Sequence, residues 1–239
     1  MKYDKVTGEV TAGPLQQVYV YEAPVRLWHW VMMVAMFVLA GTGYLIGSPL
    51  PSTGGEATFQ YLFAYVRMIH FIAAMIFSVA FLVRIYWAIV GNHAARAIFI
   101  PPVWNGNWWR GLFDQAAYYL FLKKESKLWV GHNPLAQIAM FAMYVLGTIL
   151  IIVTGFALYA QQWGWGTTPM NIMGWVFVVF GDPQWVRTIH HLAFWYVALF
   201  AIIHMYMVFR EDIMSGESVI GTMINGLRMF KRGAPKSEL

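Results

Sequence analysis

The sequence predicts an all-α fold, an integral membrane four-helix bundle with further helices at the membrane interface. Only 11% of the 239 residues are charged and 59% are hydrophobic, whereas a soluble domain usually carries about a quarter charged residues. Four apolar runs are long enough to cross the hydrocarbon layer, which takes roughly 20 residues. Aromatic residues make up 18% of the chain, as expected for a protein that meets two membrane–water interfaces.

Composition also excludes several classes of site. The chain has no cysteine, which rules out disulfides, iron–sulfur clusters, thiolate metal sites and covalently attached haem. A net charge of +5 is better explained by orientation in a membrane than by nucleic acid, so no nucleic-acid partner is expected. The first 26 residues lack the pattern of a cleavable signal peptide. The whole chain, 1–239, is therefore predicted to be one transmembrane domain.

The apolar runs set the positions of the elements. The four spans are predicted at about 27–47, 65–90, 134–160 and 186–209. The apolar stretch Ile172–Phe180 is too short to cross and is expected to stay at the interface. The segment Asn107–Lys124 mixes aromatic and charged residues, which predicts an interfacial amphipathic helix.

Basic residues predict the orientation of the spans. Lysine and arginine gather in the N-terminal tail, the 91–131 loop and the C-terminal tail, at Lys2, Lys5, Arg26, Arg96, Arg110, Lys123, Lys124, Lys127, Arg228, Lys231, Arg232 and Lys236. The loops 48–64 and 161–184 hold none. Because cytoplasmic loops carry the excess of basic residues, both termini are expected on the cytoplasmic side.

Five of the seven histidines lie inside the predicted spans, where an ionisable residue needs an explanation, and four of them can be paired by depth. His29 lies near the cytoplasmic end of the first span, and His70 lies near the outer end of the second. In the fourth span His190 is near the outer face and His204 near the inner face. The depths therefore pair His70 with His190 and His29 with His204.

The spacing in the fourth span supports this pairing. His190 and His204 are 14 residues apart, which gives about 21 Å of rise and leaves both on one face of a helix. His191 does not share this face of the helix, because its direction differs from that of His204 by about 140°. Paired neutral imidazoles fill both axial positions of a haem iron, and a helix bundle can enclose the porphyrin. The sequence thus predicts two haems b that conduct electrons across the membrane.

Arginines accompany the histidines. An arginine stands three residues before three of them, in the pairs Arg26–His29, Arg67–His70 and Arg187–His190. Residues at this spacing share a helix face, and a guanidinium is suited to a haem propionate. Arg84, toward the inner end of the second span, can serve the inner haem in the same way. Contacts with lipid headgroups at helix ends are the alternative interpretation for each arginine.

Other interpretations of the spans stay open. Intramembrane histidines also serve in packing, and a haem-free transporter is the main rival function. A transporter predicts acidic residues inside the spans, and none lies well inside any of them. The glycines of the first and third spans can let helices or a macrocycle approach closely, although ordinary helix packing explains them equally well. They are Gly41, Gly43, Gly147 and Gly155.

Seven stretches together resemble one family, the b-type cytochrome subunit of membrane-bound nickel–iron hydrogenases. They are Tyr21–Trp30 (YEAPVRLWHW), Gly41–Gly47 (GTGYLIG), Pro49–Thr58 (PLPSTGGEAT), Arg67–Phe71 (RMIHF), Arg84–Asn92 (RIYWAIVGN), Gly131–Gln137 (GHNPLAQ) and Val186–Arg210. Four spans with paired histidines alone also fit the related cytochrome b subunit of formate dehydrogenase.

The resemblance implies a set of partners and a path for electrons. The family anchors a hydrogenase small subunit (iron–sulfur) and large subunit (nickel–iron) to the bacterial inner membrane. Electrons then pass from the last iron–sulfur cluster to the outer haem, to the inner haem and to quinone. The family's ligand pattern falls on His70 and His190 for the outer haem and on His29 and His204 for the inner haem. The hydrogen-activating site belongs to the partner, so no catalytic residue is expected in this chain.

His132 has two interpretations. It stands at the cytoplasmic start of the third span, and a histidine there can relay the protons that a reduced quinone takes up. Alternatively, His132 or Asn133 caps the helix ahead of Pro134.

Overall fold

The computed structural model describes residues 16–51, 61–124 and 129–230. This part of the chain is mostly helical, and it contains four helices that are long and apolar enough to cross a membrane. The prediction of four membrane helices is confirmed. Some predicted features lie outside the described residues, namely Lys2, Lys5, Lys127, Lys231, Arg232, Lys236 and most of the stretch Pro49–Thr58.

The membrane helices are longer than the predicted spans. Helix α1 covers Ala23–Gly47 and α2 covers Leu62–Val90. Helix α9 extends over Pro183–Ser215, because its ends continue as helix through polar residues that an apolar run does not include. The Asp182 carboxylate accepts a hydrogen bond from the Trp185 backbone N–H at 2.9 Å, which caps the start of α9.

The third membrane helix is composite. It consists of α5 (Pro134–Ala139), a π-helical segment (Met140–Val145) and α6 (Leu146–Gln161). The Asn133 side chain accepts a hydrogen bond from the Ala136 N–H at 2.8 Å, and Pro134 occupies the first turn. Of the two residues considered for this cap, Asn133 therefore fills the role.

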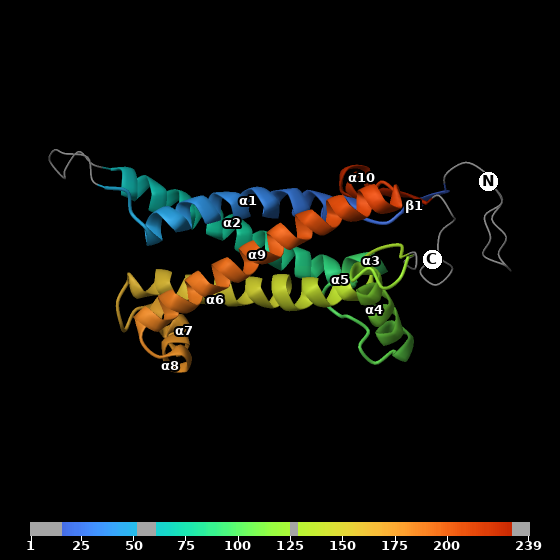
Figure 1. Cartoon of the computed structure of the whole chain (residues 1–239). Helices are drawn as coiled ribbons and strands as arrows, with labels where there is room; N and C mark the ends of the chain where they lie inside the picture. The colour runs from blue at the N-terminus through green and yellow to red at the C-terminus, as the bar shows by residue number, and fades with distance from the viewer. Residues whose placement is uncertain (1–15, 52–60, 125–128, 231–239) are drawn as a thin grey trace. The chain divides into compact units, whose positions relative to one another are not determined.

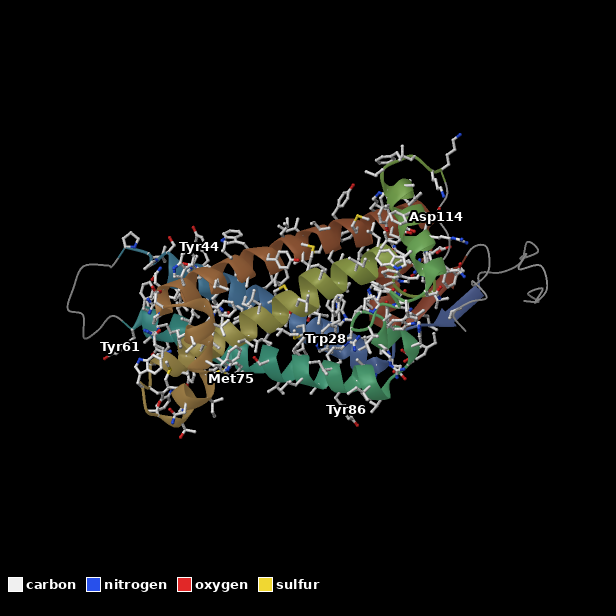
Figure 2. All side chains as sticks on the ribbon, turned by 90° about the horizontal axis from the view of Figure 1, so that it is seen from below. Trp28, Tyr44, Tyr61, Met75, Tyr86 and Asp114 are labelled. Carbon is white, nitrogen blue, oxygen red and sulfur yellow. The ribbon has the colours of Figure 1, made fainter. Side chains whose placement is uncertain are left out.

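The shorter helices match the segments that were predicted not to cross. Helix α4 (Gly106–Tyr119) overlaps the predicted interfacial segment Asn107–Lys124 but ends before it does. Its Asp114, labelled in Figure 2, pairs with Lys123 beyond the helix end. The stretch Ile172–Phe180 is divided between α7 (Thr168–Met173) and α8 (Trp175–Phe180). The remaining short helices are α3 (His93–Arg96) and α10 (Val219–Asn225).

The chain folds as two compact units whose boundaries fall inside the long helices. We name the first unit, Leu27–Tyr86 with Ile151–Phe194, the His70 unit. In it α2 packs on α6 through the rings of Phe71 and Tyr159, whose centroids are 5.0 Å apart. Figure 1 shows α7 and α8 beside the end of α6 and the start of α9. A cluster of Ala157, Ala160, Met170, Val176, Phe177 and Val186 joins these helices.

The outer surface of α2 in the His70 unit is apolar. Met75 and Tyr86 project from this helix (Figure 2) and are 42% and 59% exposed. Large apolar side chains along a helix of this length fit a lipid environment rather than water. This surface agrees with a membrane span.

We name the second unit, which comprises residues 1–26, 87–150 and 195–239, the His132 unit. It contains a small antiparallel sheet, absent from the predicted fold, in which β1 (Gln16–Tyr19) pairs with β2 (Leu227–Phe230). Gly226, just before β2, has φ +84° and accepts a hydrogen bond from the Val20 N–H at 2.8 Å. A Cβ at this glycine would lie 2.6 Å from the Tyr19 ring, so the turn requires glycine.

Candidate haem ligands and their surroundings

His70 on α2 and His190 on α9 lie in the same unit. Both side chains are half-buried. The two histidines that the sequence pairs by depth thus share a unit, and their pairing as haem ligands stays a prediction. Each ring also has a hydroxyl partner on a neighbouring helix.

The His70 ring lies against α1. The Thr42 Oγ1 is 2.9 Å from His70 Nδ1 and donates to the Val38 carbonyl at 2.6 Å. The next residue, Gly43, gives the ring room, since a Cβ there would lie 3.3 Å from His70 Cε1. A threonine and a glycine on α1 thus hold one edge of the His70 ring.

The His190 ring lies against α6 in the same manner. The Thr154 Oγ1 is 2.9 Å from His190 Nδ1 and donates to the Ile151 carbonyl at 3.2 Å. A Cβ at Gly155 would lie 3.1 Å from His190 Cε1. The dipeptide Thr-Gly therefore occurs at both histidines. The sequence interpretation included Gly43 and Gly155 but missed the threonines.

The sequence does carry a signal for these threonines. Within the four predicted spans the dipeptide Thr-Gly occurs only at 42–43 and 154–155. The first lies in the helix before the one that carries His70, and the second lies in the long helix before the one that carries His190. An internal repeat of Thr-Gly followed by Arg-x-x-His would have identified both.

The donor set fits a haem iron. With Nδ1 of each ring engaged by a hydroxyl, Nε2 is the nitrogen left for a metal, and the two rings come from different helices. Two imidazoles are the usual axial ligands of a b-type haem that transfers electrons. The neighbouring His191 is exposed and faces α1, where a Cβ at Gly47 would lie 3.0 Å from its Cε1.

His29 and His204 belong to different units and are described separately. The His29 ring meets Trp30 edge-on, with centroids 5.4 Å apart. The His204 ring stacks on Phe200 at 5.5 Å with an interplanar angle of 20°. Both histidines are half-buried within long apolar helices. Their pairing stays a prediction.

The four predicted arginines differ in burial. Arg84 is only 2% exposed, and its guanidinium lies 5.1 Å from the centre of the Trp28 ring, a cation–π geometry. Arg26 donates to the Ile224 carbonyl at 2.7 Å. The other two are exposed and contact glutamine side chains, in the pairs Arg67–Gln162 and Arg187–Gln184. Their role toward propionates stays a prediction.

His132 lies in a polar part of the His132 unit. Its Nδ1 is 3.0 Å from the Tyr21 hydroxyl. Glu22 follows Tyr21 in the sequence, and its carboxylate accepts hydrogen bonds from Trp87 Nε1 at 2.9 Å and from the Asn92 backbone N–H at 3.3 Å. His132 is therefore bonded to the N-terminal segment, while Asn133 supplies the helix cap.

Further polar contacts in this unit were not predicted. Arg228 and Glu217 form a buried ion pair at 3.3 Å, so Arg228 is not at the solvent or headgroup surface expected of an orienting basic residue. The Arg210 guanidinium lies 5.0 Å from the centre of the Tyr119 ring. Burial raises the pKa of the Tyr119 phenol, and the nearby Glu211 carboxylate raises it further.

The model of the prokaryotic cytochrome b561 family matches residues 20–226. This chain belongs to that family. Members of the cytochrome b561 family are b-type cytochromes, so the chain is an integral membrane protein that binds haem b, in agreement with its four candidate membrane helices. A haem-free transporter is no longer a competing interpretation.

Curated relatives of this cytochrome b561 cover nearly the full chain. The probable Ni/Fe-hydrogenase B-type cytochrome subunit of Azotobacter chroococcum mcd 1 is 50% identical over 218 residues, which is 91% of each chain. The protein of the same name from Azotobacter vinelandii is also 50% identical over 218 residues and 91% of each chain. The probable Ni/Fe-hydrogenase 1 B-type cytochrome subunit of Escherichia coli (strain K12) is 46% identical over 217 residues, 90% of this chain and 92% of its own.

Proposed function

We propose that this cytochrome is the membrane electron-transfer subunit of a nickel–iron hydrogenase and carries electrons through two haems b to quinone. The names of relatives that match nine-tenths of the chain support the partner. The haem ligands are supported most directly by the matching surroundings of His70 and His190, which lie in one unit and each have one ring edge held by a Thr-Gly dipeptide.

Each residue has a physical role in this proposal. His70 and His190 would hold the outer haem, and His29 and His204 would hold the inner haem, which would suit both groups to electron transfer rather than to binding oxygen or substrate. The bound haems supply one-electron redox couples. The apolar helices exclude water, and Arg26, Arg67, Arg84 and Arg187 hold the negative propionates.

The orientation and partners follow from charge. The loops without lysine or arginine, 48–64 and 161–184, lie on the outer side of a bacterial inner membrane, where the hydrogenase small and large subunits dock. Both termini lie in the cytoplasm. On the cytoplasmic side, His132 with its contact to Tyr21 would pass protons to the reduced quinone.

Adjacent histidines provide a matched test of the ligands. His190→Ala removes one axial nitrogen, so we expect half of the haem to be lost from the purified complex and hydrogen-driven quinone reduction to stop. Dye reduction by the attached hydrogenase should survive. His191→Ala alters the neighbouring ring, which faces α1, and should retain both haems. Retention of two haems in His190→Ala would refute the ligand assignment.

The partner is tested by copurification under conditions that preserve the complex. A nickel–iron enzyme bound to the tagged cytochrome supports the proposal. A molybdenum enzyme in its place would favour the formate dehydrogenase alternative.

A further inference from the structure

The Thr42 hydroxyl contacts its own helix and the His70 ring. Its oxygen is 2.6 Å from the Val38 carbonyl, 3.4 Å from the Leu39 carbonyl and 2.9 Å from His70 Nδ1. A hydroxyl has one proton to donate, and a carbonyl can only accept. The contact with Val38 is the shortest one and uses that proton. Thr42 therefore accepts from His70, and the hydrogen on the ring lies at Nδ1.

Thr154 is placed in the same way at His190, although here the contact with the carbonyl is the longer of the two. Its hydroxyl donates to the Ile151 carbonyl at 3.2 Å and lies 2.9 Å from His190 Nδ1. Because the Ile151 carbonyl can only accept, the one hydroxyl proton of Thr154 goes to it, and Thr154 accepts from His190 Nδ1. Thr154 is fully buried, so water does not compete for the hydroxyl.

We propose that Thr42 and Thr154 are positioning residues that hold His70 and His190 in the Nδ1–H tautomer and so present both Nε2 lone pairs to one haem iron. A neutral imidazole carries one hydrogen, so a hydrogen fixed at Nδ1 leaves the lone pair at Nε2. This inference rests on the proposed function, in which these two histidines bind the outer haem.

The neighbouring glycines make the hydroxyl contacts possible. A Cβ at Gly43 or Gly155 would lie within 3.3 Å of the respective ring carbon, Cε1. A larger residue would push the ring away from the threonine next to it. Each Thr-Gly dipeptide thus supplies one hydrogen-bond acceptor and the space to reach it, and both are needed to set the ring orientation.

The acceptors also affect the electronic properties of the iron. An imidazole whose Nδ1–H has an acceptor is a stronger electron donor, and such partners fix ring orientation and raise ligand basicity. A stronger donor stabilises ferric iron. Loss of the acceptor should therefore raise the midpoint potential of one haem and weaken its retention.

The test uses threonine variants of the full chain purified with its hydrogenase. Thr42→Val and Thr154→Val keep the side-chain shape without the hydroxyl, and Thr42→Ser and Thr154→Ser restore it. Thr148→Val is the matched control, because Thr148 is also fully buried on α6. The readouts are haem content, midpoint potentials and the electron paramagnetic resonance signals of the ferric haems.

We expect each valine variant to raise the midpoint potential of one haem, change its ferric signal and weaken its retention by about 10- to 100-fold. The serine variants should behave as the wild type, and so should Thr148→Val. Wild-type readouts in both valine variants would overturn the inference, as would equal effects in Thr148→Val or a failure of serine to restore the signal. His190→Ala separates the two proposals: retention of both haems there would overturn the ligand assignment itself.

Discussion

The two units bury polar groups in different ways. In the His70 unit the buried contacts described above join neutral imidazoles to hydroxyls, with Arg84 over Trp28 as the charged exception. In the His132 unit the buried contacts include full charges, above all the pair Arg228–Glu217. A haem ligand must keep a free lone pair, which a neutral and oriented ring provides. Charged pairs suit a region where strands and loops, rather than a cofactor, need to be fixed.

The dependence of the His132 unit on charge pairing is tested by Glu217→Gln. This change leaves Arg228 buried without its counter-charge, which should cost about 3 to 5 kcal/mol of stability. We expect a large fall in the melting temperature of the purified protein in detergent. The double variant Glu217→Leu with Arg228→Met removes both charges and should recover part of the loss. An unchanged melting temperature in Glu217→Gln would show that the pair contributes little.

Gly155→Ala tests whether the His70 unit depends on the close approach of the His190 ring to α6. The added Cβ would lie 3.1 Å from His190 Cε1, so the ring must shift, at a cost of about 1 to 3 kcal/mol. We expect partial loss of one haem, measured from the reduced-minus-oxidised spectrum. Gly41→Ala is the control, because a Cβ at Gly41 meets no atom within 4 Å. Equal haem content in the two variants would contradict the packing argument.

The smallest effect is expected at the contact between Tyr21 and His132. Tyr21→Phe removes one hydrogen bond, worth about 1 kcal/mol, and should slow quinone reduction while both haems are retained. His132→Ala should slow it further, since it removes the proton carrier itself. The exposed His93 serves as the control, and His93→Ala should leave turnover unchanged. Unchanged turnover in His132→Ala would assign that residue a structural role alone.

The spans could be predicted because the length of an apolar run is set by the thickness of the bilayer. Their ends could not, since α9 continues as a helix through Arg210, Glu211 and Asp212. The sheet was also missed. Its strands have four residues each and pair residues such as Val18 and Arg228, and no local pattern reveals a partner so distant in sequence.

The candidate site could be predicted only as far as the depth of each residue in the membrane indicates its partner. Histidines are conspicuous in an apolar helix, so the sequence alone predicts the pairing of His70 with His190, which stays a prediction. A threonine does not stand out, because its hydroxyl can bond a carbonyl of its own helix. Only the packing of α1 on α2 and of α6 on α9 shows that Thr42 and Thr154 also reach a ring.

The pairing of β1 with β2 means that Leu227–Phe230 does not behave as a loose tail. Phe230 is fully enclosed, in one cluster with Val20 and Tyr21. Strand β2 thus stabilises the segment that carries Tyr21, whose phenol contacts His132. Shortening or tagging the protein near Phe230 would disturb the surroundings of an imidazole nearly a hundred positions earlier in the sequence.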